Sequence, residues 1–285
     1  MEVRPYSAAI GAEISGLNLS EPLGREALLK LHRALLKYQV LFVLDQTLTP
    51  EQQIRFSRQL GDLEPYPFSK GLKNYPEITE VVKLPDEYVN FGSGWHVDMS
   101  FNQSPPDGAA LYAVEIPPAG GDTIFCNLTL AYNMLSEGHR AMLERVRGVH
   151  DSRTRYQMVN ALKGMSMVDG DEFFRCVQPL TRIHPETADT SLFISPDYLF
   201  QLEEMTQKES SILLNALEEH AVRYEFTCRY RWSPNTLVIW DNRCIMHRAI
   251  EDDIRARVSG DGFRRVMHRT TFKRFYSHDE LSKAR

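Results

Sequence analysis

The chain has 285 residues, of which 42% are hydrophobic, 25% charged and 10% aromatic, and its formal net charge at pH 7 is -5. This composition is ordinary for a folded globular protein and excludes extensive disorder. The negative charge gives no electrostatic reason to expect a nucleic-acid partner. The length suits a single domain over residues 1–285, a large β-sandwich or barrel with added helices.

The N-terminal segment has no basic stretch followed by a long apolar run, and no run of about 18 apolar residues occurs anywhere. We therefore expect neither export nor a membrane partner. Cysteines are sparse and show no C-x-x-C spacing, which argues against a disulfide framework or a zinc knuckle. The sequence predicts a cytoplasmic protein with four free cysteines, Cys126, Cys176, Cys228 and Cys244.

The start of the chain predicts a helix, a strand and a second helix. Residues 25–38 place leucines at helical spacing between charged residues, which is typical of an amphipathic helix. Residues 39–46 contain a short apolar run of strand length. Residues 49–61 begin with Thr49 as N-cap, Pro50 at the first helical position and Gln52 in capping-box position.

Further along, short strand-like runs alternate with turn residues, which predicts an antiparallel sandwich or barrel. Helices are expected over 136–146 and 206–224, the second opened by a capping box of Thr206 and Glu209. Residues 149–178 are polar and weakly periodic, so they predict a long loop or lid. The expected strands cover residues 78–84, 109–117, 122–128, 191–195, 236–242 and 264–272.

His96 and Asp98 stand two residues apart in the segment GWHVDMSF, among residues that favour strands. In a strand, side chains at i and i+2 leave the same face, so both could meet one metal ion. A lone His-x-Asp is more often a surface hydrogen-bonded pair and needs a third partner. His247 would complete the two-histidine, one-carboxylate set of the non-haem iron(II) oxygenases. Spacing alone does not separate it from the other candidates, His139, His150, His184, His220, His268 and His278.

Several ordered motifs resemble the taurine dioxygenase-like family of iron(II)- and 2-oxoglutarate-dependent oxygenases. They are IGAEISGLNLSEPL, WHVDMSF, PPAGGDTIF, RYRWSPNTLVIWDNR and RRVMHRTTF, and they run nearly from end to end. The resemblance implies a mostly β fold with α additions, a double-stranded β-helix (a distorted, cupin-like jelly roll) flanked by helices. It also implies an enzyme that uses O2 and 2-oxoglutarate to hydroxylate an unactivated C–H bond, with succinate and CO2 as coproducts.

The resemblance further implies that His96, Asp98 and His247 hold the iron. Thr123 and Arg265 would bind the distal carboxylate of 2-oxoglutarate, for which a planar guanidinium suits better than an ammonium. Arg269 would face a substrate anion or the cosubstrate. Period-two alternation places Arg265 and Arg269 on one strand face, which indicates either bound anions or a solvated edge strand.

The chain departs from taurine dioxygenase where that enzyme contacts the sulfonate with a histidine. Tyr66 stands there and carries no charge at neutral pH. Gly92 stands at or beside the position of an asparagine, which leaves more room, and residues 251–263 form a longer rim loop. These changes predict a bulkier or differently polar anionic substrate: an aryl or alkyl carboxylate, a sulfonate or a sulfate ester. The lid offers further candidates, each with solvated surface as the alternative: Arg153, Arg155 and Tyr156.

Two other functions stay open. A zinc hydrolase would activate water with the same three ligands but would leave Thr123 and Arg265 without a purpose. A non-catalytic jelly-roll binding protein would consume neither O2 nor 2-oxoglutarate. A homo-oligomer formed through the outer helices is open as well. Asp241, Gly120 and Gly121 predict turns rather than catalytic or phosphate-binding groups, and Trp240 predicts core.

Overall fold

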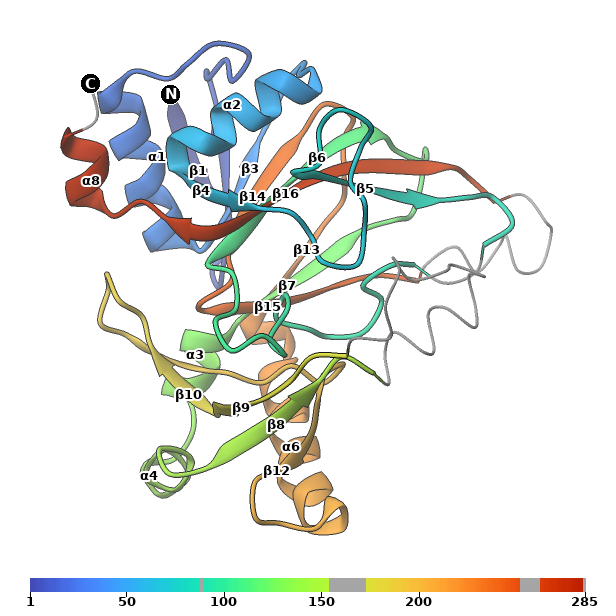
Figure 1. Cartoon of the computed structure of the whole chain (residues 1–285). Helices are drawn as coiled ribbons and strands as arrows, with labels where there is room; N and C mark the ends of the chain where they lie inside the picture. Colours follow the sequence, from blue (N-terminus) through green and yellow to red (C-terminus); the bar gives the residue numbers. More distant parts are fainter. Residues whose placement is uncertain (88–89, 154–172, 252–261, 284–285) are drawn as a thin grey trace.

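Two facing sheets form the centre of the molecule (Figure 1). The computed structural model describes residues 1–87, 90–153, 173–251 and 262–283. The larger sheet follows the order β1-β2-β3-β14-β6-β16-β4, with β5 paired to β16, and the smaller sheet follows the order β13-β7-β15. The larger sheet contains β1 (Glu2–Pro5), β2 (Ala12–Ser15), β3 (Val40–Val43), β4 (Gly61–Glu64), β5 (Ile78–Lys83), β6 (Gly108–Glu115), β14 (Leu237–Asp241) and β16 (Arg265–Phe275).

The smaller sheet contains β7 (Thr123–Asn127), β13 (Thr227–Tyr230) and β15 (Ile245–Ala249). Its side chains alternate between two cores, as the strand period requires. Phe125 and Ile245 pack against Phe42 of the larger sheet, whereas Cys126 and Met246 pack on the opposite face. The two sheets therefore enclose one hydrophobic layer, which is the arrangement of a jelly roll.

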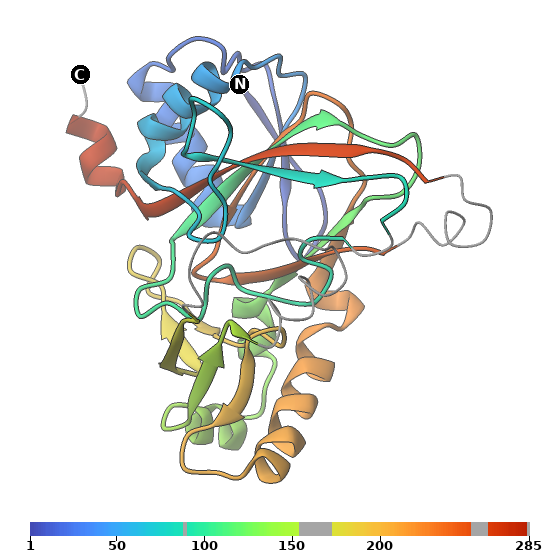
Figure 2. The same ribbon diagram turned by 45° about the vertical axis from the view of Figure 1, so that its right-hand side comes forward.

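Helices cover the outer face of the larger sheet (Figures 1 and 2). These are α1 (Arg25–Tyr38), α2 (Pro50–Leu60) and α8 (His278–Lys283). The amphipathic helix is present as predicted: Leu28, Leu31 and Leu35 of α1 are buried and share a core cluster with Phe56 of α2 and Phe272 of β16. The capping box predicted at Thr49 is present, with the hydroxyl accepting from the Gln52 backbone.

The outer face of the smaller sheet packs against a second group of helices and strands. Its helices are α3 (Leu128–Asn133), α4 (Glu137–Leu143), α6 (Gln207–Ala221) and the short 3₁₀ turn η1 (Tyr224–Phe226). The predicted capping box of Thr206 and Glu209 opens α6. A three-stranded sheet has the order β12-β8-β9, and β10 pairs with β11. The bounds are β8 (Arg147–Asp151), β9 (Arg175–Pro179), β10 (Thr181–Ile183), β11 (Thr190–Leu192) and β12 (Leu199–Leu202).

The predicted loop over 149–178 is wrong at both ends. Val149 pairs with Val177 and His150 with Cys176 where β8 meets β9. These strands are short and partly polar, so their own pattern does not reveal them. They are stabilised by pairing with each other, and β8 pairs on its other edge with distant residues of β12. Arg155 and Tyr156 lie outside the described residues, and the lid stays a prediction. Arg153 is described, and its guanidinium lies 5.0 Å from the centroid of the Phe173 ring.

The predictions about cysteines and membrane spans can be compared directly with the structure. All four cysteines are buried and free. Among the described parts of the chain, no helix combines the length and the apolar character needed to cross a membrane.

Candidate metal centre

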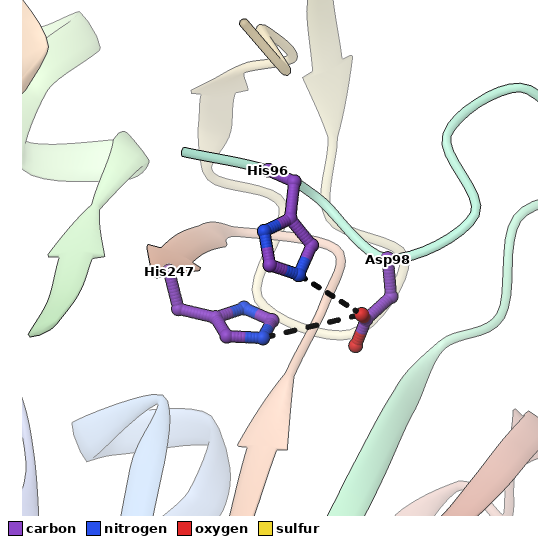
Figure 3. A group of neighbouring side chains, drawn as sticks. All are labelled: His96, Asp98 and His247. Carbon is purple, nitrogen blue, oxygen red and sulfur yellow. Dashed lines mark ion pairs between the residues drawn. The ribbon is translucent and has the colours of Figure 1, made fainter. Parts of the chain in front are cut away.

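Three side chains from distant parts of the sequence meet at one end of the layer between the sheets (Figure 3). The Nε2 atoms of His96 and His247 lie 3.6 Å and 3.9 Å from the same oxygen, Oδ1 of Asp98. One ligand atom from each residue lies within 4.8 Å of the other two. All three residues are buried, so the cluster is a compact set of donors shielded from bulk water.

Backbone pairing brings the two histidines together. His247 is the central residue of β15, opposite Phe125 of β7, and its side chain points into the layer between the sheets. His96 and His247 form an isolated antiparallel bridge, in which each backbone N–H donates to the other's carbonyl, at 3.0 and 2.9 Å. Directly opposed residues project to the same side, so this bridge fixes the spacing of the two imidazoles.

The strand expected around His96 is reduced to this single bridge, because a turn begins at Asp98. Met99 takes a positive φ of 45° within that turn. Alternation still holds across the motif itself, since Val97 is fully buried in the core on the other side of the smaller sheet. The i, i+2 argument for His96 and Asp98 therefore gives the right orientation from a segment that is not a strand.

The outer oxygen of Asp98 is engaged elsewhere, which leaves Oδ1 to the histidines. Oδ2 accepts from Nε1 of Trp240 at 3.1 Å and pairs with the Arg269 guanidinium at 2.9 Å. Burial alone would raise the pKa of Asp98, but Arg269 and the two imidazoles hold it well below its usual range. Asn242 clamps the backbone of Asp98, accepting from its N–H at 2.8 Å and donating to its carbonyl at 3.0 Å. Asp98 is therefore an ionised and oriented carboxylate, with Oδ1 facing the two histidines.

Both imidazoles are suited to bind a metal through Nε2. Nδ1 of His96 donates to the Gly94 carbonyl at 2.8 Å, which puts the proton on Nδ1 and leaves the Nε2 lone pair facing the cluster. Burial, together with the nearby His96, lowers the pKa of His247 to about 3, so this ring is neutral near pH 7. Two imidazoles and one carboxylate are the donor set that a non-haem iron(II) site requires.

A cavity of about 50 Å³ lies beside these donors. Arg265 and Arg269 both reach it from β16, with Met267 buried between them. Their exposed fractions are 7% and 6%, so the alternative of a solvated edge strand is wrong. Guanidinium groups bind carboxylates and similar anions well, so a cavity with two of them in its wall suits an anionic ligand, in addition to the pairing of Arg269 with Asp98. The lining residues are Val81, Phe91, Gly92, His96, Leu111, Thr123, Phe125, Trp232, Trp240, His247, Ala249, Arg265 and Arg269.

Thr123 and Arg265 approach the cavity from different sheets. Thr123 begins β7, and its hydroxyl accepts from Nε1 of Trp232 at 3.0 Å. Gly120 and Gly121 form the turn before β7, both with positive φ, as the turn prediction requires. A Cβ added at Gly121 would lie 3.2 Å from Cδ of Arg265, so this glycine leaves space for the arginine stem.

A protein-family model described as "Taurine catabolism dioxygenase TauD, TfdA family" matches residues 2–271. The chain belongs to this family. The alkylsulfatase of Acinetobacter baylyi is 31% identical over 88% of this chain and 80% of its own length. The alpha-ketoglutarate-dependent 2,4-dichlorophenoxyacetate dioxygenase of Cupriavidus pinatubonensis is 31% identical, covering 89% and 93%. The crystal structure of AAD-2 with Mn(II) and N-oxalylglycine superposes with a TM-score of 0.78 at 28% identity, covering 95% and 97%.

Membership confirms three of the expectations drawn from the sequence. The fold is a cupin-like jelly roll, and the protein is a dioxygenase of the TauD/TfdA family. The cofactors are those of the family, iron(II) and 2-oxoglutarate, and the His96, Asp98 and His247 cluster has donors that fit the metal. The individual roles of the site residues stay predictions.

Tyr66 of this TauD/TfdA dioxygenase lies against Arg269, at the edge of the site. The Arg269 guanidinium is 5.7 Å from the centroid of the Tyr66 ring and 5.9 Å from that of Trp240, so two aromatic rings flank it. Tyr66 belongs to a largely aromatic cluster that also includes Met99 and Phe101, which follow Asp98 in the sequence. The cluster contains Tyr66, Met99, Phe101 and Tyr198, with Phe68, Phe91, Phe173 and Phe174 packed against it.

A second group in the dioxygenase, His184, Asp241 and Cys244, also has its donor atoms close together. Arg243 occupies both carboxylate oxygens of Asp241, at 2.8 Å to Oδ1 and 2.6 Å to Oδ2. Nδ1 of His184 accepts from two backbone N–H groups, so Nε2 carries the proton and donates to Asp241 at 3.0 Å. This group is a satisfied structural network, in agreement with the turn predicted at Asp241.

Acid should destabilise the metal-free dioxygenase through its buried histidines. Burial lowers the pKa of both His247 and His150 to about 3, from 6.5. The unfolded chain takes up these protons below about pH 6.5, whereas the folded chain does not until about pH 3, so stability present above 6.5 is lost as the pH falls. Each histidine then removes about 1.4 kcal/mol per pH unit between roughly pH 6 and 4.

Urea unfolding in EDTA at a series of pH values measures this loss. The His150→Gln variant should show a shallower decline than the wild type, because one buried histidine fewer takes up a proton on unfolding. A decline of equal steepness in both proteins would contradict the prediction.

Proposed function

We propose that this dioxygenase hydroxylates a C–H bond of a small organic anion at an iron(II) ion held by His96, Asp98 and His247. The observation that carries the proposal is the shared position of these donors and two buried guanidinium groups around one cavity. A zinc hydrolase would explain the metal ligands but not Thr123 and Arg265. A non-catalytic jelly-roll protein with a vestigial metal site would keep the ligands but would consume neither O2 nor 2-oxoglutarate.

Each side chain then has a defined task. His96, Asp98 and His247 would hold the metal, and Trp240 and Arg269 orient Asp98 through its other carboxylate oxygen. When bound, iron(II) and 2-oxoglutarate supply the oxidative chemistry, with O2 as oxidant and succinate and CO2 as coproducts. Thr123 and Arg265 bind the distal carboxylate of the oxo acid by charge-assisted hydrogen bonds. The protein contributes position and exclusion of water, and no general base is required.

The substrate side of the proposal rests on Arg269, Tyr66 and the aromatic cluster. Arg269 offers charge to a carboxylate, sulfonate or sulfate ester, and Tyr66 offers a ring and a hydroxyl. The phenylalanines packed beside Tyr66 favour a substrate with a bulky apolar part over one as small as taurine. We also assign the enzyme to the cytoplasm, because its cysteines are free. Substrate profiling in which taurine reacts as well as aryl or long-chain acids would contradict the substrate assignment.

Anaerobic addition of iron(II) and 2-oxoglutarate is expected to produce a weak visible charge-transfer band. The band should be absent in His96→Ala, present in the control His278→Ala at an exposed position, and shifted by a true substrate. Zinc would give no band. If the wild-type protein binds iron(II) and 2-oxoglutarate without this band, the proposed function is contradicted.

A further inference from the structure

Trp232 has no role in the function argued so far, yet it touches both groups assigned to the distal carboxylate. It follows β13, in which Tyr230 lies directly opposite Thr123 of β7. Residues at i and i+2 of an extended segment share a face, so Trp232 continues on the side of Thr123. The side chain lines the cavity and is only 4% exposed.

The indole edge determines how the Thr123 hydroxyl can bond. Nε1–H of Trp232 donates to Oγ1 of Thr123 at 3.0 Å, and an indole nitrogen is a donor only. A hydroxyl has one proton and two acceptor positions. Because the bond from Trp232 uses an acceptor position, the hydroxyl proton of Thr123 stays available as a donor to an anion in the cavity.

The indole face lies against the second anion-binding group. The Arg265 guanidinium is centred 5.7 Å from the Trp232 ring, within the range of a cation–π contact. The ring is itself fixed, because Tyr230 meets it edge-on at 5.5 Å and stacks on Phe42 at 3.9 Å. One rigid side chain thus contacts the hydroxyl from β7 and the guanidinium from β16.

We propose that Trp232 is a positioning residue for the distal carboxylate of 2-oxoglutarate, acting through Thr123 and Arg265. This inference rests on the proposed function, since it takes the cavity to hold the oxo acid. The indole N–H orients the neutral donor, which is the Thr123 hydroxyl, and the indole face supports the charged donor, which is Arg265. Both donors are therefore ordered before the carboxylate binds. Order established before binding reduces the entropy lost when the ligand binds.

Titration of the anaerobic iron(II) enzyme with 2-oxoglutarate, followed by the charge-transfer band, measures the effect. Trp232→Phe keeps a ring but lacks the N–H, and its Kd for 2-oxoglutarate should rise roughly three- to tenfold. The Kd for 2-oxobutyrate, which has no distal carboxylate, should not change. The double variant Trp232→Phe/Thr123→Val should bind 2-oxoglutarate no more weakly than Thr123→Val alone, because the N–H acts through that hydroxyl.

Trp240→Phe is the matched control, since it also removes one indole N–H from the wall of the same cavity. Its partner is Asp98, so metal affinity should fall while the preference for 2-oxoglutarate over 2-oxobutyrate stays at the wild-type value. If Trp232→Phe does not fold, benzothienylalanine at position 232 replaces the N–H by sulfur in nearly the same shape. This variant should show the same rise in the Kd for 2-oxoglutarate, with no change in the Kd for 2-oxobutyrate.

The outcomes separate the two proposals. A wild-type enzyme without a band with either oxo acid contradicts the proposed function. A wild-type band with an unchanged Kd in the position-232 variants contradicts only the positioning role of Trp232. Equal weakening of both oxo acids, or effects of Trp232→Phe and Thr123→Val that simply add, would likewise overturn that role.

Discussion

Asp98→Ala is expected to abolish metal binding and to destabilise the metal-free fold as well. The first effect follows from loss of a ligand, for which we expect affinity to fall by more than about a hundredfold, since even supporting partners of ligands contribute that much. The second follows from Arg269, whose guanidinium pairs with Asp98 at 2.9 Å and is almost fully buried. Removing one partner of a buried ion pair typically costs about 3–5 kcal/mol.

Two measurements separate these effects: calorimetric titration with Mn(II), and urea unfolding in EDTA. The double variant Asp98→Ala/Arg269→Met should recover part of the lost stability but none of the metal affinity, because it removes the unpaired cation and restores no ligand. Asp98→Asn keeps the shape of the side chain and one acceptor oxygen, so its free energy of unfolding should lie between those of the wild type and Asp98→Ala. A metal-free Asp98→Ala protein as stable as the wild type would show that Arg269 does not depend on this carboxylate.

The sequence predicted local features best, because they depend on neighbouring residues. The capping boxes at Thr49 and Thr206 are present, since a hydroxyl and a backbone N–H three residues apart meet regardless of the rest of the fold. The common direction of His96 and Asp98 is likewise local. His247 could be chosen among nine histidines only by its surrounding motif, because its bridge to His96 joins segments about 150 residues apart.

The supporting residues of the site were not predictable in the same way. The sequence predicts Trp240 as a core residue and Asn242 as part of a turn. Both predictions are correct, but neither identifies the contact with Asp98. Their hydrogen bonds to Asp98 form because the turn that begins at Asp98 packs against the end of β14. Trp232 is a similar case, since an aromatic residue in a loop gives no sign of its partner. The missed strands β8 and β9 pair with each other, and β8 also pairs with β12.

Arg265→Gln is expected to weaken 2-oxoglutarate binding by about a hundredfold or more, because a paired, charge-assisted contact in a buried site is lost. Arg264→Gln is the matched control. Arg264 is the preceding residue, but it is exposed and pairs with Glu115 outside the cavity, so its removal should leave the affinity within about twofold. Arg265→Lys keeps the charge without the planar fork, and its affinity should fall between the two.

Binding of 2-oxobutyrate distinguishes a lost carboxylate contact from a damaged site. The affinity of Arg265→Gln for 2-oxobutyrate should differ little from that of the wild type, because this ligand has no distal carboxylate to contact the guanidinium. Arg269 provides the decisive comparison, because it shares the cavity and the strand face with Arg265. If Arg269→Gln lost the preference for 2-oxoglutarate and Arg265→Gln kept it, the two arginines would exchange roles, and the substrate anion would lie on the side of Thr123.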